Sequence, residues 1–566
     1  MKKTMKKIIS LLLGICFIGS ISSCAASYMK SSTERISDNT NTASRQKQSV
    51  PLEQAEDSGN REVNVEVAPE MRSEIDMFYG IEEDDSWRYV PVDPEEEYTD
   101  VTETPFKDVA TSPLSTFSAD VDTASYSNMR RFIQNGQIPE GVRVEEFINY
   151  FDYDFSHSSR KNEHPFTVFA EIGECPWEKD HGLAMVSIKG EDLSDDRELS
   201  NNIVFLLDVS GSMDASNKLP LLQESFKLLI EQLDEDDMIS IVTYAGSEQV
   251  IADSVPGNEH TQLKRKIDSL WAGGSTAGAS GITTAYELAE KNFIEGGNNR
   301  IILATDGDFN VGPSSVSDLE SLIEKKRENG VFITVLGFGM YNLKDNMMET
   351  IADKGNGNYA YIDTIEEARK VLVEEFDSTM YTIAKDVKFQ VEFNPEIVSE
   401  YRLIGYDNRR LENEDFENDL KDAGDIGAGH TVTVFYEIVY AGNGDGGNGN
   451  LKYQQMIPTG SDEMMTVSIR YKKPDEDTSI LTETIVDQKN YAKRPSNNFQ
   501  FASAVTEYAL ILKDSEFKGN ASLSHVQDSA LAAIGEDEYG LRREFVQLVE
   551  MYRNISDSEV EPYIYE

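Results

Sequence analysis

The chain has 566 residues, and 52 Lys and Arg against 102 Asp and Glu give it a formal net charge of −50. A chain this acidic repels phosphate backbones and anionic headgroups, so its composition argues against nucleic acid and peripheral lipid surfaces as ligands. With 39% apolar residues, the length allows about three or four domains with real cores. Acidic chains bind hard cations readily on oxygen ligands, although most of these acids are expected only to solubilise the protein.

The first residues are typical of an export signal. Four lysines precede an apolar run at residues 8–21, which is shorter than the roughly 20 residues that span a bilayer as a helix. The run ends in Ile21-Ser22-Ser23-Cys24, which resembles a bacterial lipobox. This resemblance implies that residues 1–23 are removed and that Cys24 is acylated by fatty acids such as palmitate. An ordinary secretory signal with an incidental cysteine is the alternative.

Residues 24–105 are rich in Ser, Thr, Asn, Gln and acids, and we expect them to form a disordered acidic tether. Residues 106–198 form a second segment, with short helices expected at 125–134 and 144–150 and strands at 166–172 and 183–188. Cys175 in this segment is expected to be a small buried apolar residue, since no other cysteine remains to pair with it.

Residues 199–380 alternate strongly apolar runs with amphipathic helical patterns. Continuous apolar strands between helices predict a parallel sheet covered on both faces, the doubly wound α/β class. The expected elements are strands at 203–207, 238–244, 300–304 and 331–336 and helices at 219–233, 282–293 and 316–327.

From residue 381 the pattern changes to the alternation of half-buried antiparallel strands. We expect strands at 387–393, 431–439, 464–471 and 478–486 in a β-rich domain at 381–490, followed by a C-terminal helical segment at 491–566. We further hypothesise that the strands near 166–188 pair with those after 383, so that the α/β domain is inserted into a β-sandwich-like unit. The predicted fold is therefore multi-domain α+β around an α/β core.

One set of side chains carries chemistry. The first α/β strand ends in Asp208-Val209-Ser210-Gly211-Ser212, and ligands of open α/β sheets bind at the carboxyl ends of strands. A later glycine-rich segment offers Thr276, and another strand ends in Asp306. Carboxylate and hydroxyl oxygens are hard donors that suit Mg²⁺, Mn²⁺ or Ca²⁺ rather than zinc or copper. A metal-free loop capped by its own Ser and Thr is the alternative interpretation.

This set resembles the metal-ion-dependent adhesion site of von Willebrand factor type A domains, which have a Rossmann-like doubly wound fold. The resemblance implies that Ser210, Ser212 and Thr276 bind the metal directly, while Asp208 and Asp306 bind it directly or through water. It also implies that a carboxylate of a protein partner, from an Asp or Glu, completes the metal shell. Mg²⁺ is the expected cation, with Mn²⁺ or Ca²⁺ as alternatives.

A longer resemblance covers about residues 98–553. Segments at 117–128, 143–151, 304–312 and 401–406 are similar to the YfbK-like group of bacterial lipoproteins that contain a type A domain. The resemblance implies binding at the cell envelope, with no defined partner.

The sequence favours a binding protein over an enzyme. Its six histidines form no H-E-x-x-H motif, and no G-x-S-x-G elbow or Walker A loop occurs. We therefore expect a lipid-anchored envelope protein that touches the membrane through the Cys24 lipid only and binds no nucleic acid. It would lie at the outer membrane or periplasm of a two-membrane cell, or on the extracytoplasmic face of a single membrane. A metal-independent envelope scaffold and a metal-assisted hydrolase are the alternatives.

Overall fold

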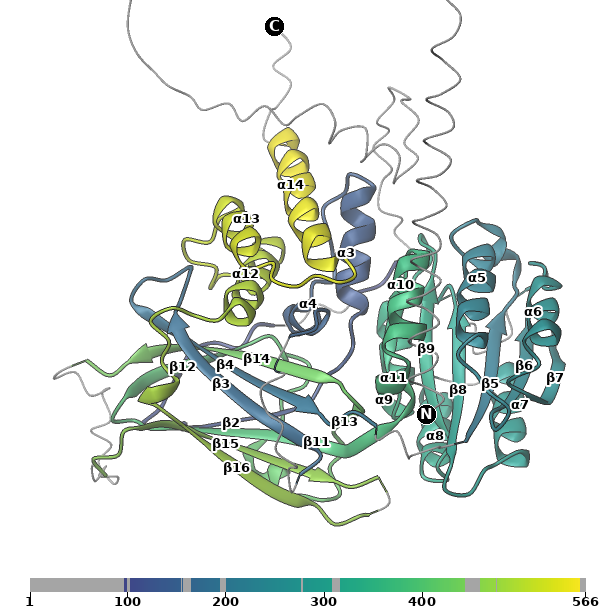
Figure 1. Ribbon diagram of the computed structural model, residues 1–566, viewed down its shortest axis with the longest axis horizontal. Helices are drawn as coiled ribbons and strands as arrows, with labels where there is room; N and C mark the ends of the chain where they lie inside the picture. Colours follow the sequence, from purple (N-terminus) through teal and green to yellow (C-terminus); the bar gives the residue numbers. More distant parts are fainter. Residues whose placement is uncertain are drawn as a thin grey trace, which may run out of the picture. The chain divides into compact units, whose positions relative to one another are not determined.

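The computed structural model of the protein contains a six-stranded sheet flanked by helices, beside two five-stranded sheets (Figure 1). Residues 89–566 form one compact unit. Cys24 and the predicted signal and tether lie almost entirely outside the residues that the structure describes. These residues are 96–98, 102–153, 155, 164–193, 200–275, 278–307, 316–442, 459–474 and 476–559.

The six-stranded sheet is mostly parallel, which confirms the predicted α/β class. Only β7 runs antiparallel, at one edge, and the alternating polar residues of this strand gave no signal of a buried parallel strand. In order across the sheet, the strands are β10 (Tyr359–Ile362), β9 (Phe332–Phe338), β8 (Asn298–Thr305), β5 (Asn201–Asp208), β6 (Met238–Tyr244) and β7 (Glu248–Pro256).

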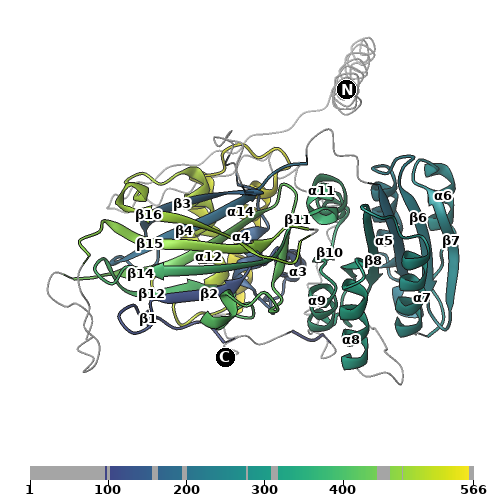
Figure 2. The same ribbon diagram turned by 90° about the horizontal axis from the view of Figure 1, so that it is seen from below.

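Both faces of this sheet are covered, as a continuous apolar strand requires. Phe205 of β5 packs with Phe226 of α5 on one face, whereas Val204 and Leu206 pack with Ile282 of α7 on the other. Figure 2 shows these helices on either side of the strands. The helices are α5 (Leu219–Ile230), α6 (His260–Asp268), α7 (Gly278–Lys291), α8 (Val316–Arg327), α9 (Asp345–Lys354), α10 (Ile365–Arg369) and α11 (Phe376–Met380).

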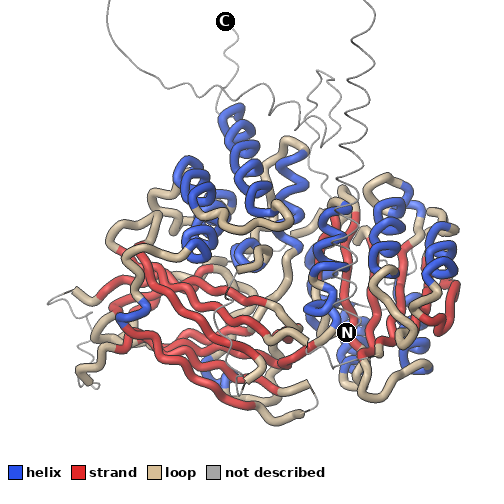
Figure 3. The backbone as a smooth tube through the Cα atoms, viewed as in Figure 1, coloured by secondary structure: helices blue, strands red, loops and turns tan. Residues whose placement is uncertain are grey.

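Two antiparallel sheets form a β-sandwich with a shared apolar core, seen as two layers of strands in Figure 3. One sheet has the order β1-β12-β14-β4-β3, and the other has the order β13-β11-β15-β16 with β2 also paired to β11. Their bounds are β1 (Lys107–Asp108), β2 (Leu114–Ser118), β3 (Phe166–Glu174), β4 (His181–Gly190), β11 (Thr382–Phe393), β12 (Val398–Ile404), β13 (Gly424–Gly427), β14 (Thr431–Tyr440), β15 (Glu463–Lys472) and β16 (Ile480–Asp487).

The sandwich is built from both sides of the α/β domain. Strand β4, which precedes that domain, pairs along nine residues with β14, which follows it, so that Val186 lies opposite Val434. This shared ladder confirms the hypothesis that the α/β domain is inserted into the β unit. The boundaries predicted for the separate segments are not themselves tested by this pairing.

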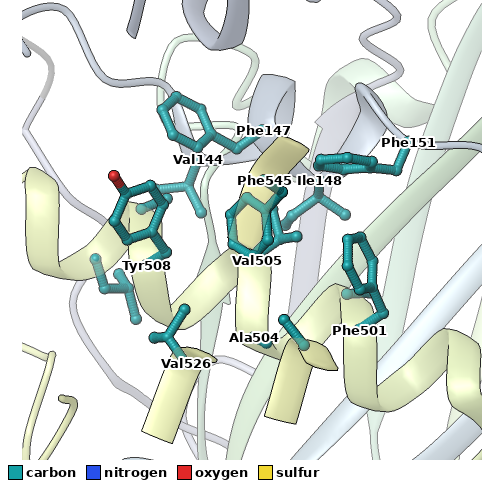
Figure 4. Close-up of a cluster of buried hydrophobic side chains, with 14 of the residues drawn as sticks. Val144, Phe147, Ile148, Phe151, Phe501, Ala504, Val505, Tyr508, Val526 and Phe545 are labelled. Carbon is teal, nitrogen blue, oxygen red and sulfur yellow. The ribbon is translucent and has the colours of Figure 1, made fainter. Parts of the chain in front are cut away.

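Five helices from the two ends of the described chain pack into a further core. Phe147 of α4, Phe501 of α12 and Phe545 of α14 meet in the buried cluster shown in Figure 4. Cys175 lies in the same cluster, buried as predicted, and burial raises the pKa of its thiol. The helices are α3 (Ala124–Gln134), α4 (Val144–Asn149), α12 (Asn497–Leu512), α13 (Leu523–Ala532) and α14 (Leu541–Glu559). Among the described residues, no helix combines the length and the apolar character needed to cross a bilayer.

Buried and partly buried ion pairs tie the α/β domain to the other parts of the unit. Arg409, which follows β12, lies 2.7 Å from Asp353 of α9 and 3.1 Å from Asp122, while Arg143 lies 2.6 Å from Asp345 of α9. Removing one partner of a buried ion pair is costly because a charge is then left without compensation. We name this group the arginine cluster, and it comprises Asp120, Asp122, Arg143, Glu146, Asp345, Glu349, Asp353 and Arg409.

Candidate metal centre

The two predicted aspartates lie at the carboxyl ends of neighbouring parallel strands. Strand β5 ends at Asp208, and β8, which pairs with it in parallel, ends one residue before Asp306. Both carboxylates are fully buried. The sequence explains this position, because the two parallel strands carry polar residues at their carboxyl ends, which lie at the same edge of the sheet.

The loop after β5 folds back on Asp208. The Ser210 N–H donates to Oδ1 of Asp208 over 2.8 Å, and the hydroxyls of Ser210 and Ser212 lie 2.9 Å apart. Met213 is fully buried and anchors the short 3₁₀ helix Gly211–Asp214, whereas Ser212 in the same turn is exposed. Two hydroxyl oxygens and one carboxylate are therefore gathered on one tight loop that solvent reaches.

The end of β8 contributes the second carboxylate and a supporting hydroxyl. Oγ1 of Thr305 donates to Oδ2 of Asp208 over 3.1 Å and accepts the N–H of Gly307. Gly307 has a φ of 89°, and a Cβ there would lie 2.5 Å from the backbone nitrogen of Lys344. The turn after Asp306 thus requires glycine on both conformational and steric grounds.

The segment before Thr276 is hydrogen-bonded to the loop that follows β5, residues 208–212, which we name the metal loop. The N–H of Gly273 donates to the Val209 carbonyl over 2.8 Å, and the N–H of Gly211 donates to the Gly274 carbonyl over 3.1 Å. These hydrogen bonds join the D-x-S-x-S loop to the glycine-rich segment, which the sequence predicts to lie at the same site. Thr276 itself lies outside the described residues, so its expected contact with the metal stays a prediction.

Lys218 is the feature of this site that sequence reasoning missed. Its Nζ donates to Oδ2 of Asp306 over 2.9 Å and to Oδ1 of Asn342 over 2.8 Å. The side chains of Lys218 and Asp306 are 8% and 0% exposed. Asn342 follows β9, so the pair depends on a loop more than a hundred residues away in the chain, and no local motif identifies it.

The two carboxylates titrate differently because their surroundings differ. Burial raises the pKa of Asp208 to about 6, although the hydrogen bond from the Ser210 N–H acts in the opposite direction. Burial also acts to raise the pKa of Asp306, but the charge of Lys218 and hydrogen bonds from Asn342, Lys218 and Ser212 outweigh it and lower this pKa.

The donors fit a hard divalent cation. The described part of the chain holds no cluster of three or more His, Cys, Asp and Glu side chains suited to a metal, so a zinc-type or carboxylate-cage site is not present there. Asp208, Ser210, Ser212 and Asp306 instead offer carboxylate and hydroxyl oxygens, which match the preferences of Mg²⁺, Mn²⁺ and Ca²⁺.

An exposed aromatic side chain lies next to this loop. Trp271 is 77% exposed, and its ring packs so closely on Gly273 that a Cβ at Gly273 would overlap it. Because the Gly273 N–H donates to the Val209 carbonyl, this contact places the indole near the loop that follows β5. Isolated exposed apolar residues are common, but tryptophan is enriched where proteins bind one another.

The parallel sheet, the D-x-S-x-S loop and the second aspartate define the class: residues 200–380 form a von Willebrand factor type A domain. Comparison with known families agrees. The family model described as "von Willebrand factor type A domain" matches residues 202–375. The model described as "von Willebrand factor" matches residues 93–185, and the model described as "Uncharacterized protein YfbK, C-terminal" matches residues 378–555.

Comparison with individual relatives shows the family to which the chain belongs. The chain is 42% identical over 474 residues to "Uncharacterized protein YfbK" of Escherichia coli (strain K12), with 81% of each protein covered. It therefore belongs to the YfbK family. It is also 27% identical over 164 residues to inter-alpha-trypsin inhibitor heavy chain H3 of Homo sapiens, covering 28% of this chain and 18% of that protein. Among solved structures, von Willebrand factor type A from Catenulispora acidiphila is similar with 16% identity and a TM-score of 0.39, covering 69% and 92% of the two chains.

Proposed function

We propose that this protein binds a protein partner at the cell envelope through a divalent cation held by Asp208, Ser210, Ser212, Thr276 and Asp306. The observation that carries the proposal is the pair of serine hydroxyls 2.9 Å apart, between a buried carboxylate and solvent. When bound, the cation supplies an electrophilic centre for an oxygen anion. An Asp or Glu carboxylate of the partner then completes its coordination, with Mg²⁺ as the first candidate and Mn²⁺ or Ca²⁺ as alternatives.

The surroundings of the site support a binding role over a catalytic one. Asp208 accepts hydrogen bonds on both carboxylate oxygens, and Asp306 is paired with Lys218. These contacts hold both carboxylates in place as candidate ligands for a cation. The exposed Trp271 beside the loop offers a partner an apolar contact next to the metal.

The test combines metal binding with partner capture. Mg²⁺ and Mn²⁺ are titrated into the wild type and Asp208→Ala while thermal unfolding is followed, and envelope extracts are passed over both immobilised proteins with and without chelator. A metal that binds only the folded state must raise its melting temperature. We expect the wild type alone to gain stability and to release its captured partner when the metal is removed. Equal responses of the two proteins contradict the proposed site.

A metal-independent scaffold is the second candidate, and the arginine cluster favours it. Arg409 and Arg143 join segments that come from three parts of the chain through buried and partly buried ion pairs, which suits a rigid assembly platform. The same capture experiment separates the two candidates. A scaffold retains its partner in chelator, whereas a metal-dependent binding protein loses it.

The location at the envelope is also a proposal. The lysines and apolar run before Cys24 support export and acylation of that cysteine. The lipid would hold the protein on the membrane, since two or three acyl chains anchor far better than one. Labelling of cells with a palmitate analogue is expected to mark the wild type and to leave Cys24→Ser unmarked and in the soluble fraction. Equal labelling of both proteins rules out Cys24 as the lipid site.

A further inference from the structure

Lys218 is held at the metal centre by contacts with Gly339, Asp306 and Asn342. It lies directly before helix α5, and its aliphatic side chain crosses Gly339, where a Cβ would overlap it. Gly339 has a φ of 77°, which glycine adopts without strain. The ammonium group then reaches Asp306 and Asn342 over 2.9 and 2.8 Å. Three parts of the domain thus position one cation.

The position of this lysine is unfavourable for the helix itself. The N-terminal end of a helix carries partial positive charge, and a cation there is repelled while an anion is stabilised. Lys218 is the N-cap residue of α5, and its side chain makes no capping hydrogen bond. Helix stability therefore does not explain a buried lysine at this place, whereas the buried Asp306 carboxylate does.

The charge at the centre depends on Lys218. Asp208 and Asp306 with the ammonium group leave one net negative charge before a metal binds and one net positive charge after a divalent cation binds. Without the lysine, the two carboxylates carry two negative charges alone, and a divalent cation only neutralises them. The ammonium group thus weakens metal binding and strengthens the subsequent attraction of an anion.

We propose that Lys218 sets the charge of the metal centre so that the cation and a carboxylate ligand bind cooperatively. The inference rests on the proposed function and adds its regulation. The ammonium group of Lys218 would weaken the binding of a divalent cation alone, and the net positive charge of the occupied centre would attract a carboxylate. By linkage, the carboxylate strengthens metal binding to the same degree. The carboxylate thus becomes part of what holds the metal.

Isothermal titration of the full chain with Mg²⁺ tests the inference, in matched buffers that contain either chloride or acetate as a probe carboxylate. We expect Lys218→Met and Lys218→Gln to bind Mg²⁺ in chloride about tenfold or more tightly than the wild type, within the range of 5- to 150-fold typical of coupled sites. Acetate is expected to strengthen Mg²⁺ binding to the wild type and to have a smaller effect on both variants.

Two variants and a control separate charge from packing. Lys218→Gln keeps a hydrogen-bond donor but loses the charge, so a charge effect requires it to behave like Lys218→Met. Lys227→Met removes a partly exposed lysine of the same helix and is expected to bind Mg²⁺ like the wild type. Mg²⁺ binding by both Lys218 variants no tighter than that by the wild type overturns the inference, as does an equal acetate effect in all proteins. Absence of Mg²⁺ binding by the wild type overturns the proposed function instead, and with it the inference.

Discussion

The metal centre and the arginine cluster both bury carboxylates, but they compensate the negative charge in different ways. In the arginine cluster, Arg143 and Arg409 face six carboxylates and pair with them, and burial raises the pKa of several of these, including Asp122 and Asp353. At the metal centre, Lys218 pairs with Asp306, while Asp208 accepts hydrogen bonds from its own loop beside the exposed Ser212. The first arrangement joins parts of the chain through ion pairs, whereas the second leaves net negative charge at the edge of the sheet, where we propose that a cation binds.

The largest expected effect comes from removing the arginine that joins the most carboxylates. Arg409→Met leaves buried acids without their cation, and the free energy of unfolding is expected to fall by about 3–5 kcal/mol. Chemical denaturation with and without Mg²⁺ measures this loss, which Mg²⁺ does not restore. Lys473→Met, which breaks an exposed pair with Glu476, is the control and is expected to cost less than about 1 kcal/mol. Equal losses in the two variants would show that the cluster contributes no special stability.

The second largest expected effect is the pH dependence of stability that arises from Glu349 in the arginine cluster. Burial raises the pKa of Glu349 to about 7, although the charges of Arg143 and Arg409 act to lower it. This pKa is higher in the folded state than in the unfolded state, so protonation of Glu349 favours folding. This contribution to the free energy of unfolding is fully present below about pH 4.5 and is lost as the pH rises through about 7. Glu349→Gln is expected to be less sensitive to pH in this window and, at pH 8, more stable than the wild type by up to about 3 kcal/mol. Parallel stability curves for the two proteins between pH 5 and pH 8 would contradict this.

The lysine of the metal centre is expected to behave unlike Arg409. In chelator, Lys218→Met leaves the buried Asp306 without its cationic partner and is expected to lose about 1–3 kcal/mol of stability. Saturating Mg²⁺ is expected to restore this loss, because the cation replaces the ammonium group. Melting temperatures of the variant across a Mg²⁺ series measure the recovery. A loss that persists at every Mg²⁺ concentration would mean that Lys218 acts structurally, like the arginines.

The smallest expected effect on the folded protein comes from the exposed indole. Trp271→Ala removes an exposed side chain, so the free energy of unfolding and the affinity for Mg²⁺ are expected to stay unchanged. Binding of the captured partner is expected to weaken by about 1–2 kcal/mol. Surface plasmon resonance with the immobilised variant measures this difference. Full partner affinity in the variant would place the contact surface elsewhere.

Much of the fold could be predicted because its signals are local. The apolar strands, the amphipathic helices and the change to alternation after residue 381 each depend on neighbouring residues, and Asp208 and Asp306 follow from where two strands end. The edge strand β7 and the pairing of Lys218 with Asp306 could not be predicted in this way. The lysine is 88 residues from Asp306 and 124 from Asn342, so only tertiary structure brings these groups together.

The same reason explains why the arginine cluster gave no signal. Arg143 and Asp345 are 202 residues apart, and each resembles an ordinary charged surface residue in an acidic chain. Most Arg and Asp side chains in proteins are exposed, so the sequence alone predicts that any single one lies at the surface. The insertion of the α/β domain brings the two segments together, and this topology was foreseen only as a hypothesis about the flanking strands.

Direct measurement of Mg²⁺ binding to the full chain tests the central claim most directly. Isothermal titration of the wild type, in parallel with Asp208→Ala, determines the stoichiometry and affinity without any knowledge of the partner. One Mg²⁺ per wild-type chain, with binding lost in Asp208→Ala while the variant remains folded, is the predicted result. Absence of binding to the wild type, or equal binding to both proteins, would contradict a metal centre at the end of β5.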